Sequence, residues 1–191
     1  MRTRMSLTLI ATVLGLSALL WTQDARSLPE YAQARDVARQ VLEESRTLLM
    51  KELASKGAAG AVDACAAVAL DLGRKHEAAG WRVRRVSTRL RNPADAPDAY
   101  EATVLGRFAA DGVKPEAEHV GVSTEQGKRY LRYLKPIVIP GELCLKSHGD
   151  PASMDPKDVE ILRSRYPQDR ATEHRVGDLR GAVSVRIPLS K

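Results

Sequence analysis

Hydrophobic residues recur at helical spacing over the first long polar stretch of the chain, from Ser27 to about Leu53. This spacing predicts one long helix with a single buried stripe. Ser27-Leu28-Pro29-Glu30 has the capping-box pattern with a proline near the first turn, which places the start of the helix there. The stretch Gly57 to Gly60 ends it. The predicted stripe consists of Val37, Val41, Leu42, Leu48, Leu49 and Leu53.

An alanine-rich segment predicts a second helix from about Ala61 to Ala79, which stops at Gly80. The hydrophobic period then changes to that of a strand between Trp81 and Leu90. Val83 and Val86 fall out of phase with each other within this strand, which predicts a bulge near Arg84-Arg85. A further helix is predicted from about Asp98 to Ala110.

Two strands are predicted next, at His119 to Thr124 and Lys128 to Ile139. Glu125-Gln126-Gly127 separates them and has the length and composition of a hairpin connection. Pro140-Gly141 breaks the second strand.

The last third of the chain is predicted to hold a loop with Cys144 and His148, followed by a short helix at about Pro156 to Arg165. A final strand follows, in which Val183, Val185 and Ile187 alternate inward, and Pro188 ends it near a sheet edge. Helices first, then antiparallel strands with interposed helices, indicate an α+β domain with a meander-like sheet behind a long N-terminal helix.

The N-terminus has the pattern of an export segment. Arg2 and Arg4 precede an apolar run from Met5 to Trp21 that contains no charge. We therefore interpret residues 1–27 as a signal peptide or an uncleaved membrane anchor, and residues 28–191 as one domain in the periplasm. Two cysteines in that compartment form a disulfide unless something else occupies them.

The formal net charge of the 191-residue chain is +6. Basic and acidic residues are interspersed along it, so the charge favours solubility and does not indicate a nucleic-acid interface.

The stretch Cys144 to Pro151 carries the chemistry. It reads Cys144-Leu145-Lys146-Ser147-His148, a C-x-x-S-H sequence one substitution away from the C-x-x-C-H motif of haem c attachment. In that motif two thiols add to the haem vinyl groups and the histidine ligates the iron.

Four other segments accompany this motif in a recognisable order. Together they resemble the PAS-like c-type haem domain family of exported bacterial proteins. The resemblance implies a PAS-like fold, haem attached at the C-x-x-C-H loop, and a His/Cys pair of iron ligands, which correspond here to His148 and Cys65. The four segments are Ser87 to Tyr100, Tyr130 to Ile137, Tyr166 to Thr172 and Gly177 to Ala182.

Ser147 departs from the family pattern, because a serine hydroxyl cannot form the second thioether. Two alternatives follow from the resemblance. Either haem is held by one thioether through Cys144 or without a covalent bond, with His148 and Cys65 on the iron, or the domain is free of haem and a Cys65–Cys144 disulfide stabilises it.

The other candidate residues carry less. His76 and His174 have no suitably spaced partner ligand and His119 begins a strand, so a zinc site is not predicted. Asp178 and Arg180 fit a turn and are expected to form a structural ion pair.

No nucleophile is paired with a base, so we do not expect an enzyme. The expected function is an extracytoplasmic PAS-like domain for haem-dependent redox or small-ligand sensing that acts on a partner protein. The alternative is a haem-free, disulfide-stapled binding module. Contact with the membrane is expected only through the N-terminal segment, if it is not cleaved.

Overall fold

The computed structural model of the chain describes residues 24–61, 71, 73–75, 77, 79–110 and 112–190. Residues 1–23 of the predicted export segment lie outside the described residues, as does Cys65. Within them, no helix combines the length and the apolarity needed to cross a bilayer.

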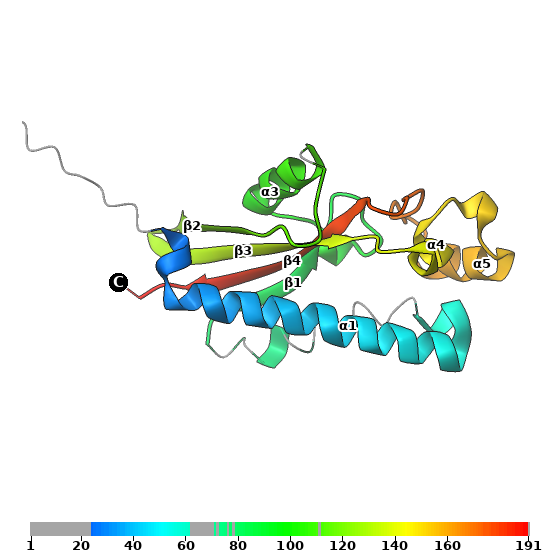
Figure 1. Cartoon of the computed structure of the whole chain (residues 1–191), viewed down its shortest axis with the longest axis horizontal. Coiled ribbons are helices and arrows are strands. Elements are labelled where there is room, and N and C mark those ends of the chain that lie inside the picture. Colours follow the sequence, from blue (N-terminus) through cyan, green and yellow to red (C-terminus); the bar gives the residue numbers. More distant parts are fainter. Residues whose placement is uncertain are drawn as a thin grey trace, which may run out of the picture.

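Helix α1, Pro29–Ala61, runs along one face of a sheet and continues past the end of that sheet (Figure 1). Gly57 has φ 67° and ψ −166°, so the helical geometry breaks where the sequence predicted the helix to end. The predicted stripe is confirmed in the first half of the helix, where Val37 and Val41 are buried.

The predicted capping box at the start of α1 is wrong. Ser27 belongs to a short 3-10 helix, η1 (Ala25–Ser27), and its hydroxyl donates to the carbonyl oxygen of Asp24 at 2.8 Å. Pro29 is the first residue of α1, as expected for a residue without an N–H to satisfy.

Four antiparallel strands form the sheet in the order β1-β4-β3-β2. Gln126 and Gly127 both have positive φ, 50° and 75°, as a two-residue hairpin turn between β2 and β3 requires. The last strand is central, so its predicted place near an edge is wrong. The strands are β1 (Arg82–Val86), β2 (His119–Glu125), β3 (Lys128–Val138) and β4 (Leu179–Pro188).

The main hydrophobic core lies between α1 and the sheet. Val183, Val185 and Ile187 of β4 point into it, as their alternation predicted. The remaining buried residues of this core are Ala34, Val37, Ala38, Val41, Val83, Leu131 and Tyr133.

Helix α3, Ala99–Ala110, covers the opposite face of the sheet (Figure 1). Asp98 and Glu101 form a reciprocal capping box at its start: the N–H of Glu101 donates to Asp98 Oδ1, and the N–H of Asp98 donates to Glu101 Oε2, both at 2.8 Å. Val104 and Leu105 of this helix pack on Val86 and other buried residues of the second core.

Coverage on both faces explains why the bulge predicted in β1 is wrong. Val83 and Val86 lie three residues apart on a regular strand and therefore point to opposite faces, and each enters a different core. The only register shift in the described pairings falls between Ile137 and Val138 of β3.

A buried ion-pair network lies under the start of α3. Arg132, 2% exposed, reaches Asp98 Oδ2 at 2.6 Å and Glu125 Oε1 at 2.8 Å. Glu101, 3% exposed, accepts a hydrogen bond from the Ser184 hydroxyl at 2.7 Å. These buried charges are paired, as their burial requires.

Three short helices follow β3 at the end of the sheet where α1 projects beyond it (Figure 1). They are α4 (Glu142–His148), η3 (Pro151–Ser153) and α5 (Pro156–Arg165). The position of α5 is confirmed, and Asp155 caps it by accepting from the N–H of Lys157. The loop predicted around Cys144 and His148 is wrong, because both residues lie in helix α4. Pro140-Gly141 ends β3 as predicted, and the helix begins directly after it.

Gly181 marks a close approach of β4 to the end of β1. Its φ is 157°, and an added Cβ would press on the carbonyl oxygen of Val86 and lie 3.2 Å from Ser87 Cβ. We expect Gly181→Ala to lower the free energy of unfolding by about 1–3 kcal/mol, the cost of a strained backbone. Gly141→Ala is the matched control, since nothing lies within 4 Å of its added Cβ. Urea unfolding should separate the two variants; equal stability would contradict the packing described here.

Candidate functional site

Helix α4 brings the residues of the C-x-x-S-H motif onto one face. Cys144 and His148 are four residues apart, so their side chains are neighbours on the helix surface. Both are partly buried. Glu142 lies in the first turn, while Lys146 and His148 lie in the last turn, a charge distribution that suits the helix dipole.

A backbone carbonyl orients the imidazole of His148. Its Nδ1 lies 2.7 Å from the carbonyl oxygen of Ala171. A carbonyl only accepts, so Nδ1 carries the proton and Nε2 keeps its lone pair. Burial, together with Arg180 and Arg91, holds the pKa of His148 well below its usual range. The ring is therefore neutral near pH 7, in the form that binds a metal.

The loop that supplies Ala171 is joined to the end of α4 by backbone hydrogen bonds. The N–H of His174 donates to the carbonyl oxygen of His148 at 2.8 Å, and the N–H of Glu173 donates to that of Gly149 at 2.7 Å. Glu173 has φ 58°, a conformation that non-glycine residues seldom adopt. The loop thus follows α4 closely at the cost of one strained residue.

A buried ion pair closes a ring of contacts around His148, which we call the His148 clamp. Arg91 Nε donates to Asp169 Oδ2 at 2.9 Å, and its Nη2 donates to the carbonyl oxygen of Ser147. Asp169 Oδ1 accepts from the N–H of Ala171 at 2.7 Å, and Ala171 in turn holds the imidazole. Arg91 and Asp169 are 7% and 9% exposed, so this pair is shielded from solvent.

Arg180 is a second buried cation beside the clamp. Its Nη1 donates to Ser87 Oγ at 3.0 Å and to the carbonyl oxygen of Arg89 at 3.3 Å, both neutral acceptors. Its Nε is buried without a partner among the described residues. The predicted ion pair with Asp178 is wrong, because Asp178 Oδ2 instead accepts from the N–H of Arg175.

Four guanidinium groups gather in this region, those of Arg85, Arg89, Arg91 and Arg180, and the carboxylates of Asp95 and Asp169 offset part of their charge. Burial, aided by the charges of Arg85 and Arg91, lowers the pKa of Arg180 to about 9. A dry site with several cations favours neutral histidines and attracts anions.

His174 is a second imidazole next to His148. The two rings lie edge to face with centroids 6.1 Å apart. His174 is 4% exposed, its Nε2 is buried and has no hydrogen-bond partner among the described residues, and its Nδ1 lies 3.9 Å from Asp178 Oδ2. Burial, together with Arg89 and Arg180, lowers its pKa to about 4.

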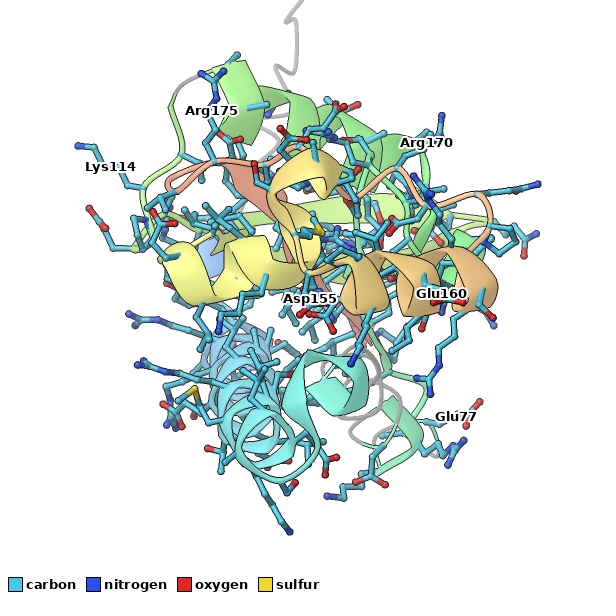
Figure 2. All side chains as sticks on the ribbon, turned by 90° about the vertical axis from the view of Figure 1, so that its right-hand side faces the viewer. Glu77, Lys114, Asp155, Glu160, Arg170 and Arg175 are labelled. Atoms are coloured by element: carbon cyan, nitrogen blue, oxygen red, sulfur yellow. The ribbon has the colours of Figure 1, made fainter. Side chains whose placement is uncertain are left out.

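A cavity of about 940 Å³ lies between the far end of α1 and the helices α4 and α5. Figure 2 looks onto this end of the molecule and shows Asp155, one of the lining residues, between these helices and α1. His174 lines the cavity, as do Leu145 and Gly149 on either side of His148 along the chain. Its apolar lining comes from Met50, Leu53, Leu143, Leu145 and Met154.

Large apolar side chains are exposed at this cavity. Met50 is 51% exposed and Leu143 is 38% exposed, although both are hydrophobic. Exposed apolar side chains around a concave surface are typical of a ligand pocket.

The donor set fits haem in part. His148 offers a neutral, oriented imidazole, and Cys144 lies one helical turn before it. Cys65, the other expected ligand, lies outside the described residues, so neither its ligation nor the disulfide alternative is tested. No cluster of three or more His, Cys, Asp or Glu side chains suited to a metal ion occurs in the described part of the chain.

Comparison with known proteins identifies the family of the chain and a solved structure with a similar fold. The family model Tll0287-like matches residues 23–188. The chain belongs to the Tll0287-like family. The crystal structure of the cyanobacterial heme-protein Tll0287 is similar with a TM-score of 0.68 and 27% sequence identity, and the match covers 86% of this chain and 99% of that one. A comparison with curated proteins gave no match.

The predicted fold class is confirmed by this likeness. The chain has an α+β, PAS-like fold, with an antiparallel sheet, flanking helices and a long helix in front. Membership of the Tll0287-like family also supports the predicted resemblance to haem-binding proteins.

Sequence reasoning missed three parts of the site: the His148 clamp, the buried Arg180 and the second imidazole, His174. The segments that carried the resemblance contain Arg91, Asp169, Ala171 and Arg180, so they marked the region without revealing the contacts. No spacing rule indicated His174, because it lies near His148 through backbone hydrogen bonds between the loop before β4 and the end of α4.

The clamp predicts a large difference between buried and exposed ion pairs. We expect Arg91→Ala to lower the free energy of unfolding by about 3–5 kcal/mol, because it leaves the Asp169 carboxylate buried without a counter-ion. Arg39→Ala, which removes an exposed ion pair with Glu43, should leave the free energy of unfolding nearly unchanged. Urea unfolding measures both. Similar losses in the two variants would show that the clamp is not a buried interaction.

Because folding lowers the pKa values of buried histidines, we expect the haem-free protein to lose stability in acid. Folding lowers the pKa of His174 to about 4, whereas the unfolded value is about 6.5. The unfolded state therefore binds a proton first, and the contribution present above pH 6.5 is lost as the pH falls toward 4. His174 alone should lower stability by about 2 kcal/mol between pH 7.5 and pH 5.

His174→Gln removes this titration and should give a shallower pH dependence in urea unfolding. His148 and His119, whose pKa values are also lowered, keep their contributions in the variant. An unchanged pH dependence would contradict the buried, neutral state of His174.

Proposed function

We propose that this protein is an extracytoplasmic haem-binding domain in which His148 ligates the iron through Nε2, and that it senses redox state or a small ligand. The orientation of His148 carries the proposal. Its Nδ1–H is held by Ala171 and its Nε2 lone pair is available for a metal. The structural similarity to a cyanobacterial heme-protein supports haem binding.

The surroundings of His148 support a large, mainly apolar ligand. The adjoining cavity of about 940 Å³ is within the range of ligand pockets, and its walls include exposed Met50 and Leu143. Haem burial would cover these side chains, and haem supplies the one-electron chemistry or ligand binding that sensing needs.

The motif allows at most one covalent link. The Cys144 thiol can add its S–H across a vinyl double bond without any oxidant, and a serine at position 147 cannot. Cys65, by family resemblance, is the proposed second iron ligand. A thiolate ligand would favour a low reduction potential, which suits sensing more than high-potential electron transfer. We propose that the response is passed to a partner protein.

The test is expression of the protein in a periplasm with haem c maturation, with the absorption spectrum and the intact mass as readouts. We expect a Soret band that His148→Ala shifts or abolishes and that the matched variant His119→Ala leaves unchanged. A haem-sized mass increase retained after denaturation, and lost in Cys144→Ser, identifies a single thioether. Ser147→Cys should increase the covalently loaded fraction.

The absence of a Soret band in both the natural protein and Ser147→Cys would contradict haem binding. If the mass under non-reducing conditions is also two hydrogens below that of the reduced chain, the Cys65–Cys144 disulfide is present and the haem-free binding module is the correct alternative.

A further inference from the structure

His174 is an unsatisfied polar group on the wall of the cavity. It is 4% exposed, its Nε2 has no hydrogen-bond partner among the described residues, and it lines the cavity beside His148. Buried polar atoms in native proteins are almost always paired, so an unpaired one at a pocket wall indicates a partner on the ligand or an ordered water.

His174 cannot face His148 across a bound planar group. The backbone N–H of His174 donates directly to the carbonyl oxygen of His148 at 2.8 Å, so the two residues come from the same wall. A polar contact beside the iron ligand, and not a second axial bond, is the role that this placement allows.

The charges around the cavity indicate the class of the partner group. The acidic lining residues Glu142, Asp150 and Asp155 are exposed at the rim, and Asp158 is half-buried there with Lys146 as the basic lining residue. The buried His174 lies instead near Arg89, Arg180 and Arg91, whose combined effect exceeds that of the Asp178 carboxylate 3.9 Å from its Nδ1. A ligand carrying a carboxylate is therefore repelled at the rim and attracted at His174.

We propose that His174 binds a carboxylate of the ligand, a haem propionate, by donating a hydrogen bond from Nε2–H. The proposal deepens the proposed function and rests on it. Arg180 strengthens the interaction electrostatically, because its own hydrogen bonds go to neutral oxygens and leave its charge uncompensated by them.

The test compares haemin with haemin dimethyl ester, in which both propionates are esterified. The full chain, kept reduced, is titrated with each and the dissociation constants are measured by absorbance. We expect the natural protein to prefer haemin, and His174→Leu to reduce that preference about tenfold, the effect of losing one hydrogen bond to a charged group. His174→Gln keeps an N–H donor and should retain most of the preference.

His119→Leu is the matched control, because His119 lies on β2, is hydrogen-bonded to Tyr100 of α3 and does not line the cavity. It should leave the preference unchanged. If the His174→Leu variant does not fold, Arg89→Met tests the electrostatic attraction at His174 instead. It should also reduce the preference for haemin over its ester.

The outcomes separate the inference from the proposed function. Equal affinity of the natural protein for haemin and its ester, or an equal loss of both in His174→Leu, would overturn the propionate contact and show that Nε2 is satisfied by water. No saturable haemin binding, or binding unaffected by His148→Ala, would overturn the proposed function and the inference with it.

Discussion

The other contacts of the site depend on the hydrogen bond that His148 Nδ1 donates to the carbonyl oxygen of Ala171. It requires α4, the loop after β1 and the loop before β4 to meet at one point. The sheet order achieves this. Strands β1 and β4 are antiparallel neighbours, so the last residues of β1 and the first residues of β4 lie at the same end of the sheet. The Arg91–Asp169 pair then joins the two loops to α4. One imidazole is thus positioned by three segments that are distant in sequence.

Electrostatics keep that imidazole in the useful form. Arg91 and Arg180 are buried close to both histidines, and their charges oppose protonation of either ring. This costs stability, because Arg180 is desolvated while its hydrogen bonds reach only neutral oxygens. The α3 side of the sheet shows the opposite solution, where Arg132 is buried among carboxylates. Arg132 is thus compensated by carboxylates, whereas the hydrogen bonds of Arg180 beside the His148 clamp reach none.

The fold was largely predictable because most of its signals are local. Helix α5 begins at Pro156 as predicted, with Asp155 as its cap, and the Glu125-Gln126-Gly127 connection indicated the hairpin. Errors arose where the pattern had two physical causes. The out-of-phase valines of β1 indicated a bulge but reflect a sheet covered on both faces. Cys144 and His148 could be predicted from their motif, whereas Arg91 and Asp169, 78 residues apart, share no local pattern at all.

Positioning of His148 and covalent attachment of a ligand are separable in this chain. Arg91 bonds the backbone carbonyl of Ser147, not its side chain, so the clamp is indifferent to whether that residue is serine or cysteine. The hydrogen bond that the imidazole donates to Ala171 likewise uses a backbone oxygen. A serine at this position therefore removes one possible thioether while leaving the orientation of the histidine intact. The backbone contacts that orient His148 therefore do not depend on the side chain at position 147.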